Sequence, residues 1–462
     1  MQTMNDNLPK GWTIAKLGDI CFTTSGGTPS RKMPNYYGGN IPWVKSGELD
    51  KGLILDTEEK ITEEAIKNSS AKVFPKGTLL IALYGATVGK LAFLGIDATT
   101  NQAVCGIYKS EAIESKLLYY FLLLQKSNLV SQSIGGAQPN ISQGIIKDLI
   151  IPLAPLNEQK RILAKLEQLL TDLDKGIEYL ETTKQQIKIY RQAVLKWAFE
   201  GIKEFTNLND VGSWMGGGTP STQNKEYWNG GNVLWVSSQD VKSKYINDTE
   251  RKITELAIEN SSTKWIKKDS LLFVVRSGIL RRIFPIAIAQ KDLCVNQDIQ
   301  TLSLNDNYHT EFVYWYLLGN ESAIRYKCAK DGTTVESIDV QKLKNYQIPK
   351  ANLDTQIKVI QEIESRLSVC DKIEETIESS LQQAEALRLS IIKKAFEGKL
   401  VPQDPNDEPA EKLLERIRAL RQSSTKLTSR AQGKQGKEKP EKKEKVKAEK
   451  KPAQKRNEKI EI

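Results

Sequence analysis

Apolar residues recur at intervals of three and four positions along two long stretches of the chain, residues 155–203 and 351–400. In both stretches they fall at the a and d positions of a heptad frame, and this spacing predicts long helices that pack along a shared seam, as in a coiled coil. Because the chain has to return from one end to the other, we expect the helices to be antiparallel. The alternative is two ordinary amphipathic helices, each packing on its own domain.

The predicted seam is mostly apolar but carries charged residues at several of the later a positions. Packing there must loosen unless these charges pair across the seam. In the first helix the a positions are Leu163, Leu170, Ile177, Lys184 and Arg191, and the d positions are Leu166, Leu173, Leu180, Ile187 and Val194. In the second helix the a positions are Ile360, Leu367, Glu374, Leu381 and Arg388, and the d positions are Ile363, Cys370, Ile377, Ala384 and Ile391.

The other two large stretches, residues 1–154 and 204–350, mix short apolar runs with glycine-rich turns. Within them, residues 73–94 and 265–288 each place two apolar runs around a polar turn, which predicts a pair of strands. Residues 117–132 and 311–328 have the pattern of short helices that cover a sheet. Each stretch is therefore predicted to form an α+β domain of ordinary size.

The two halves of the chain repeat one another. TEEKITEEAIKNSS at residues 57–70 returns as TERKITELAIENSS at residues 249–262, and GGTPS occurs at residues 26–30 and 217–221. A repeat of this length is a duplicated domain and not a solenoid unit. We therefore expect a pseudo-two-fold molecule, which suits a target that has two related halves.

Composition narrows the class of protein. The chain is 39% hydrophobic, enough for a core in each half, and its five cysteines are scattered, which is typical of a reducing compartment. We see no signal segment and no apolar run long enough to cross a membrane, so we expect a cytoplasmic protein without membrane contact. Nearly all of the net charge of +10 lies in residues 421–462. The stretch 401–462 is predicted to hold a short amphipathic helix and a disordered basic tail.

Residue patterns typical of catalysis are missing from the sequence. The single histidine, His309, argues against catalytic triads and histidine metal clusters. GATVGKL at residues 85–91 has too few residues between its glycines for a phosphate loop, and Leu91 stands where Ser or Thr would hold magnesium. We therefore expect a non-catalytic chain with no metal site and no cofactor of its own.

The first candidate binding surface is the repeated GGTPS turn together with the strand that follows each later GGN. Its glycines would let a ligand approach the backbone, and its hydroxyl, amide and lysine side chains would contact phosphates or base edges. The nearby Trp43 and Trp235 are interpreted as core residues. The proposed contacts are Gly27, Thr28, Ser30, Lys45 and Ser46 in the first half and Gly218, Thr219, Ser221, Ser237, Ser238 and Gln239 in the second.

The second candidate surface is the turn between the predicted paired strands, where the two halves diverge although their flanks match. Divergence here is what two different targets would require, and arginine suits both guanine edges and phosphates. The alternative is a pair of variable solvent loops. The residues are Tyr84, Thr87 and Lys90 in the first half and Arg276, Ser277, Arg281 and Arg282 in the second. A third, polar stretch offers Gln138 and Asn140 in the first half and Thr333 and Thr334 in the second.

These features together resemble the specificity subunit of type I DNA restriction–modification enzymes. Two α+β domains alternate with two similar long helices, each domain carries G-T-P-S and a later W-V, and each ends in an I-P strand exit. The first exit runs into PLNEQKRI at residues 155–162. The resemblance spans residues 8–420 and implies an α+β fold. In it, two homologous target-recognition domains are separated by two long antiparallel coiled-coil helices, with pseudo-two-fold symmetry.

The resemblance also implies a function and partners. Each domain would read one half of a bipartite site in double-stranded DNA, and the helices would set the gap between the halves. The subunit would recruit two methyltransferase subunits, which use S-adenosylmethionine, and two translocase–nuclease subunits, which use ATP and magnesium. Partner contacts would begin at Asn157, Glu158, Gln159 and Arg161 in the first copy and at Asp354, Gln356 and Lys358 in the second, where Thr355 replaces Glu158.

Other functions stay open from the residues alone. A heptad seam also fits a coiled-coil scaffold with two protein-binding domains, and the aromatic residues also fit an RNA-binding module that stacks bases. The missing motifs disfavour a stand-alone nuclease or methyltransferase. Sequence-specific DNA binding, measured with a methyltransferase partner and with RNA as competitor, separates these possibilities.

Overall fold

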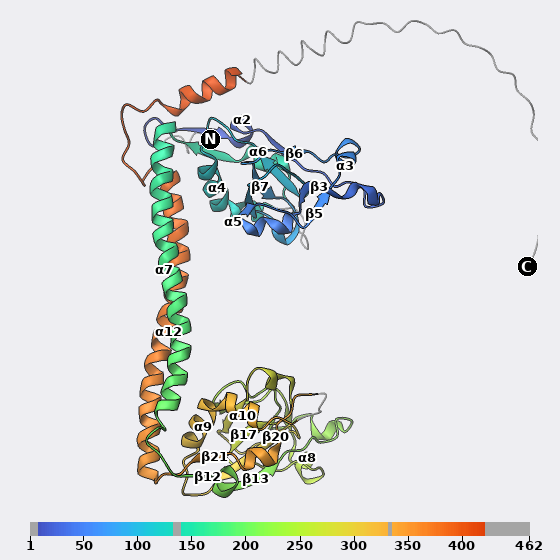
Figure 1. Cartoon of the computed structure of the whole chain (residues 1–462), viewed down its shortest axis with the longest axis vertical. Helices are drawn as coiled ribbons and strands as arrows, with labels where there is room; N and C mark the ends of the chain where they lie inside the picture. The colour runs from blue at the N-terminus through green and yellow to red at the C-terminus, as the bar shows by residue number, and fades with distance from the viewer. Residues whose placement is uncertain (1–7, 133–139, 331–334, 421–462) are drawn as a thin grey trace, which may run out of the picture. The chain divides into compact units, whose positions relative to one another are not determined.

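The structure of the chain, a computed structural model, describes residues 8–132, 140–330 and 335–420 (Figure 1). The chain divides into two compact units. Unit 1 consists of Met1–Asp172 together with Ala386–Ile462, and unit 2 consists of Leu173–Glu385. Among the described helices, none is long and apolar enough to cross a membrane.

Unit 1 is built on a five-stranded sheet whose middle strand, β7, is antiparallel to both of its neighbours. The strand order is β2 (Thr23–Ser25), β10 (Val104–Ile107), β7 (Leu79–Ala82), β8 (Leu91–Leu94) and β4 (Leu53–Ile54). A second sheet has the order β5 (Glu59–Ile61), β3 (Tyr37–Val44), β9 (Ala98–Thr100) and β6 (Val73–Phe74), and β1 (Thr13–Lys16) pairs with β11 (Ile150–Leu153). The short helices are α2 (Leu17–Ile20), α3 (Glu63–Lys67), α4 (Ser115–Leu124), α5 (Lys126–Ser131) and α6 (Gln143–Asp148), with 3-10 turns η1 (Pro34–Tyr36), η2 (Ser46–Lys51) and η3 (Gly85–Thr87).

Unit 2 repeats this topology, except that an isolated bridge between Ile266 and Leu293 stands in place of β6. Its five-stranded sheet has the order β13 (Gly212–Gly216), β20 (Ile299–Leu304), β17 (Leu271–Val274), β18 (Ile286–Ala289) and β15 (Tyr245–Ile246). The second sheet has the order β16 (Lys252–Ile253), β14 (Val233–Val236) and β19 (Cys294–Val295), and β12 (Phe205–Asn207) pairs with β21 (Gln347–Pro349). The short helices are α8 (Glu255–Glu259), α9 (Thr310–Gly319), α10 (Glu321–Lys327) and α11 (Val340–Lys344), with 3-10 turns η4 (Leu208–Val211), η5 (Lys225–Tyr227) and η6 (Gly278–Arg281).

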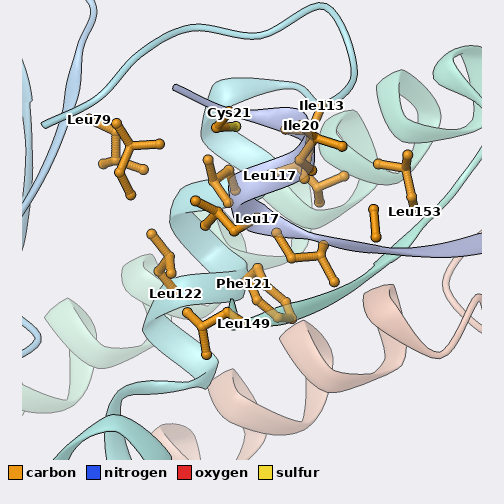
Figure 2. Packing of buried hydrophobic residues seen from close by; sticks show 14 of the residues in the cluster. Leu17, Ile20, Cys21, Leu79, Ile113, Leu117, Phe121, Leu122, Leu149 and Leu153 are labelled. Carbon is orange, nitrogen blue, oxygen red and sulfur yellow. The ribbon is translucent and has the colours of Figure 1, made fainter. Parts of the chain in front are cut away.

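The middle strand of each large sheet is apolar throughout because both of its faces are covered. In β7, Leu79 and Ile81 join the cluster that contains α4, whereas Leu80 and Ala82 join the cluster on the other face. Successive side chains of a strand point to opposite faces, so one run of apolar residues supplies two cores. Figure 2 shows the first of these clusters, with Leu79 near residues of α2 and α4. Strand β17 divides its residues between two clusters in the same way.

The two long helices are α7 (Leu156–Trp197) and α12 (Leu353–Phe396), and the predicted seam is confirmed within each unit. In unit 2, Ile187 packs with Cys370 and Ile377, all at predicted d positions. The helices are antiparallel there, since Lys184 pairs with Glu378 at 2.7 Å while Arg191 pairs with Glu374 at 2.9 Å. The charged a positions Lys184, Arg191 and Glu374 therefore pair across the seam.

Unit 1 also contains the segment that follows α12. Residues 410–420 are helical, and Ala410, Leu413, Leu414 and Ile417 join the main apolar cluster of the unit. Their spacing places them on one helix face, as the amphipathic pattern predicted. Ahead of this helix, Arg161 of α7 pairs with Asp407 at 2.7 Å, and at its first residue the amide of Ala410 donates to the carbonyl of Gly11. This segment, residues 401–417, is called the C-terminal strap.

Candidate nucleic-acid interface

Five separate segments of unit 1 meet at the C-terminal end of β7, and backbone hydrogen bonds join them. They are residues 26–30, 44–46, 83–90, 101–103 and 140–143, and together they are called the loop surface of unit 1. The bonds run from the amide of Gly27 to the carbonyl of Thr100 (2.9 Å), Asn101 to Val44 (3.0 Å), Leu83 to Ala103 (2.8 Å) and Ile141 to Leu83 (2.9 Å). The first two predicted surfaces and the described part of the third, residues 140–143, are therefore parts of one surface.

Unit 2 forms the same network at the end of β17. Its loop surface consists of residues 217–221, 236–239, 275–282, 296–298 and 335–339. The bonds run from the amide of Gly218 to the carbonyl of Val295 (3.0 Å), Asn296 to Val236 (2.9 Å), Val275 to Asp298 (2.9 Å) and Ile338 to Val275 (2.8 Å). An isolated bridge joins Arg276 to Ser337, as Tyr84 is bridged to Asn140 in unit 1.

The turn at the centre of each network, Asn101–Gln102 or Asn296–Gln297, is called the NQ turn. It is not among the predicted contacts, although the identical dipeptide stands in both copies of the repeat. The hydroxyl of Thr28 donates to the side-chain oxygen of Gln102, and Thr219 donates in the same way to Gln297. Both glutamines are exposed, and so they belong with the candidate contacts.

The predicted role of the paired glycines is wrong. Gly27 and Gly218 are buried, and a Cβ atom on either would lie 2.4–2.5 Å from Ser70 or Ser262. Their close approach is therefore to the protein's own backbone, which leaves no room for a ligand at their N–H groups. Their carbonyls accept from the indoles of Trp43 and Trp235, at 3.1 and 3.0 Å. The prediction that these two tryptophans belong to the core is confirmed.

A cation lies on the tryptophan of each unit, which the sequence interpretation did not anticipate. The guanidinium of Arg31 lies 4.3 Å from the ring of Tyr37 and also faces Trp43. In unit 2 the guanidinium of Arg251 lies 3.9 Å from the ring of Trp228 and also faces Trp235. The two arginines come from different positions of the repeat, so matching residues of the two copies could not reveal them.

The strand that follows each GGN carries polar residues, and some of them already bond other residues of the same unit. Lys45 pairs with Glu58 at 2.8 Å and with Glu59 at 3.2 Å, and these hydrogen bonds raise the pKa of its ammonium group. Ser237, at the same place in unit 2, bonds Asp240 through both its amide and its hydroxyl. A phosphate contact by Lys45 would have to replace its two carboxylates. The remaining predicted residues of this surface are exposed at Ser30, Ser221 and Gln239 and partly buried at Ser46 and Ser238.

The hairpin turn differs in charge between the units. In unit 1, Tyr84 is exposed, Thr87 bonds the carbonyl of Tyr84, and Lys90 pairs with Asp50. In unit 2, Arg276 and Arg282 are exposed and the side chain of Ser277 accepts from the amide of Ile279. Arg281 is 70% exposed and pairs with the exposed Glu336 at 3.2 Å, a contact that water weakens.

A partly buried arginine supports the hairpin of unit 2. Arg325 of α10 donates from Nη1 to the carbonyls of Arg281 (3.0 Å) and Leu280 (3.4 Å), and its Nε lies 3.7 Å from Glu321. Val130 stands at the matching place of the first copy, so this support is particular to unit 2. On the third predicted surface, Asn140 is exposed beside Tyr84, whereas Gln138, Thr333 and Thr334 lie outside the described residues.

Two of the predicted partner contacts are interior residues. Gln159 donates to the carbonyls of Ala112 and Ala154, both at 2.9 Å, and accepts from the amide of Glu114. Gln356 makes the matching set of three bonds in unit 2. Both glutamines are fully buried, so a direct partner contact does not fit the structure at these positions. Their role is to hold the start of each long helix to its α+β domain.

The other predicted partner residues lie at the surface or under the C-terminal strap. Asn157, Asp354 and Lys358 are exposed. Glu158 is buried, accepts a 3.1 Å bond from the indole of Trp12, and has its pKa raised by desolvation. Thr355 replaces Glu158 in unit 2, where Lys203 stands in place of Trp12. The two copies therefore differ at this position because Trp12 covers Glu158 in unit 1, whereas Lys203 stands in the place of Trp12 in unit 2.

Comparison with known proteins points to one family. The model of the type I restriction modification DNA specificity domain matches residues 9–188 and again residues 201–383. The specificity subunit of the Escherichia coli enzyme EcoR124I/EcoR124II is 31% identical over 245 residues, which are 53% of this chain and 58% of that relative. The EcoKI specificity subunit of Escherichia coli K12 is 23% identical over 90% of this chain and 97% of its own.

Two solved structures share the fold. A chain from a structural study of complex assembly in the type I R-M system aligns with a TM-score of 0.68 at 19% identity, covering 85% of this chain and 99% of its own. The HsdS subunit from Thermoanaerobacter tengcongensis aligns with a TM-score of 0.56 at 18% identity, covering 85% and 98%.

Proposed function

Because the chain belongs to the family of type I restriction modification DNA specificity domains, we propose that each of its units reads one half of a bipartite site in double-stranded DNA. One observation carries this proposal. Both units build the same backbone network at the end of the middle strand, yet they place different side chains on the hairpin above it. A constant support with variable side chains is what two different half-sites require.

The chemistry of the two hairpins supports different readings. Unit 2 offers Arg276, Arg281 and Arg282, whose guanidinium groups suit guanine edges and phosphate oxygens. Unit 1 offers Tyr84, Asn140 and a lysine that is already paired with a carboxylate. Unit 2 would therefore bind the DNA backbone more strongly, and its affinity would depend more on salt.

The proposed role is recognition and recruitment, without catalysis by this chain. The subunit would recruit two methyltransferase subunits and two translocase–nuclease subunits, and S-adenosylmethionine, ATP and magnesium would be bound by those partners. The exposed Asn157, Asp354 and Lys358 near the starts of the long helices stay candidates for the partner contact. The scaffold alternative predicts the same seam but no preference for a DNA sequence.

Mapping methylated adenines tests the proposal. The chain would be expressed with its methyltransferase subunit in a host that lacks other adenine methylation. We expect one sequence with two specified halves to be methylated. Replacing residues 276–282 by the equally long residues 84–90 should then change the bases of one half only. The paired control Lys267→Ala with Lys268→Ala, at the opposite end of β17, should leave the methylated sequence unchanged.

Two results would contradict the proposal. The first is methylation with no sequence preference, which would favour a scaffold that only brings the enzyme to DNA. The second is a hairpin chimera that is folded and active but methylates the original sequence, which would place recognition elsewhere in unit 2.

A further inference from the structure

The threonine–glutamine pair of the NQ turn is the same in both units, whereas the hairpins beside it diverge. Thr28 with Gln102 and Thr219 with Gln297 occupy matching places and make the same side-chain bond. Residues that read different half-sites must differ between the copies. A pair that does not differ and whose glutamine is exposed is suited to something that both half-sites share.

The bond within each pair occupies the side-chain oxygen of the glutamine. The side-chain oxygen of each glutamine accepts from the threonine hydroxyl, so the amide nitrogen keeps two N–H groups for another acceptor. The exposed glutamine therefore presents mainly a neutral hydrogen-bond donor. The acceptor that DNA repeats at every nucleotide, whatever the sequence, is the phosphate oxygen.

The backbone beneath the glutamine is held on both sides. The preceding residue, Asn101 or Asn296, donates its amide to β3 or β14, and the following residue accepts from the first residue of the hairpin. A donor on a turn anchored in this way loses little conformational freedom on binding. The same anchoring places each glutamine beside its hairpin.

We propose that Gln102 and Gln297 donate to a DNA phosphate in each half-site and thereby set the position of the hairpins over the bases, independently of sequence. This inference rests on the proposed DNA recognition and adds residues that hold the duplex without reading it. The contact is neutral, so it releases no counterion of its own.

The experiment measures DNA affinity of the full chain bound to its methyltransferase subunit, as a function of salt, on the methylated sequence and on a set with each specified base pair changed. Gln102→Ala and Gln297→Ala should each weaken binding about tenfold on every DNA of the set. The double variant should lose about a hundredfold, because the sites are independent. The slope of affinity against salt should stay that of the unaltered protein. Gln290→Ala, an exposed glutamine outside the loop surface, should bind normally.

Glu replacements keep the test valid if the alanine variants misfold. In Gln102→Glu and Gln297→Glu the threonine can still donate to the side-chain oxygen, while the outward N–H groups become a charged acceptor. Binding should then fall further than with alanine. Unaltered affinity in all variants overturns the inference and leaves DNA recognition standing. A loss that disappears when one particular base pair is changed also overturns it, because the glutamine would then read a base. Failure of the unaltered complex to select any DNA sequence overturns both proposals.

Discussion

The two units differ most in the side chains of their hairpins, although the backbone networks beneath the hairpins are nearly the same. At the ends of β7 and β17, matching amides and carbonyls join matching segments, down to a tryptophan that donates to a glycine carbonyl in each unit. The hairpins on this support carry Tyr84 and a paired Lys90 in one unit and three arginines in the other. Duplication has thus kept the backbone network and varied the side chains that project from it.

A second contrast lies at the starts of the long helices. Gln159 and Gln356 make the same three bonds, yet Glu158 lies buried under Trp12 whereas Thr355 is only partly buried. The C-terminal strap belongs to unit 1, and it adds the Arg161–Asp407 pair there. The units are therefore equivalent in how they hold their helices and unequal in what covers the helix starts.

Removing the buried tryptophan from either backbone network should have the largest effect on stability. It tests whether the two networks contribute equally to it. Trp43→Ala and Trp235→Ala each delete a buried ring and leave a glycine carbonyl without its donor, so each should cost about 3–5 kcal/mol of unfolding free energy. Calorimetry and denaturant titration measure this. Trp265→Ala, at a 46% exposed position, should cost far less. Clearly unequal losses of unfolding free energy for Trp43→Ala and Trp235→Ala would show that the two networks contribute unequally to stability.

Removing the arginines of the unit 2 hairpin tests whether the difference in charge between the two hairpins affects DNA binding. Arg281→Ala with Arg282→Ala should weaken DNA binding about tenfold or more and reduce the slope of log affinity against log salt by about two, because two phosphate contacts are lost. Fluorescence anisotropy at several salt concentrations measures both quantities. Lys267→Ala with Lys268→Ala removes the same charge elsewhere in unit 2 and should leave the slope nearly unchanged. An unchanged slope in the arginine variant would argue against phosphate contacts by this hairpin.

Removing the support that only unit 2 possesses should have a smaller, one-sided effect. Arg325→Ala frees the carbonyls of Leu280 and Arg281, so the hairpin should hold its arginines less firmly and affinity should fall about fivefold. Discrimination against base changes should weaken in the half-site of unit 2 only, as measured by binding to single-substitution DNAs. Val130→Ala is the matched change in unit 1. Equal loss of discrimination in both halves would contradict a local role for Arg325.

Weakening the strap should have the smallest effect. Asp407→Asn removes the charge that pairs with Arg161 and should cost about 1 kcal/mol or less, because the arginine is partly exposed. Hydrogen bonding to Arg161 lowers the pKa of Asp407, so the pair's contribution is present above the carboxyl's ordinary pKa of 3.8 and is lost as the pH falls through the lowered value. Thermal unfolding from pH 7 down to pH 2 measures this, and the difference between the two proteins should shrink as the pH falls below 3.8.

Much of the fold could be predicted because its patterns are local. The heptad spacing located the seam around Ile187 and Ile377, and the paired apolar runs located β7 and β17. The repeat also showed which parts of the two halves correspond. These features depend on periodicity and on sequence identity within the chain, and both can be read without knowing which distant segments meet.

The candidate site was less predictable because its bonds join segments that are distant in sequence. The NQ turn receives its partners from residues 28, 44 and 83, and no local pattern connects them. The sequence does not show what approaches Gly27, because a close approach to a ligand and a close approach to the protein's own backbone both require glycine. Gln159 is expected as a partner contact from its place at a helix start, yet its amide satisfies buried carbonyls that come from distant segments.

The segments that form each unit determine when that unit can fold during translation. Unit 2 is one continuous stretch, Leu173–Glu385, whereas unit 1 needs its first residues and also Ala386 onward. Phe396 and the strap residues Leu413 and Leu414 belong to the same apolar cluster as Leu17. A ribosome delivers these late partners last, so unit 2 can close during translation while unit 1 must wait with part of its interior open. The nascent chain would therefore depend on chaperones mainly through its earliest-made domain.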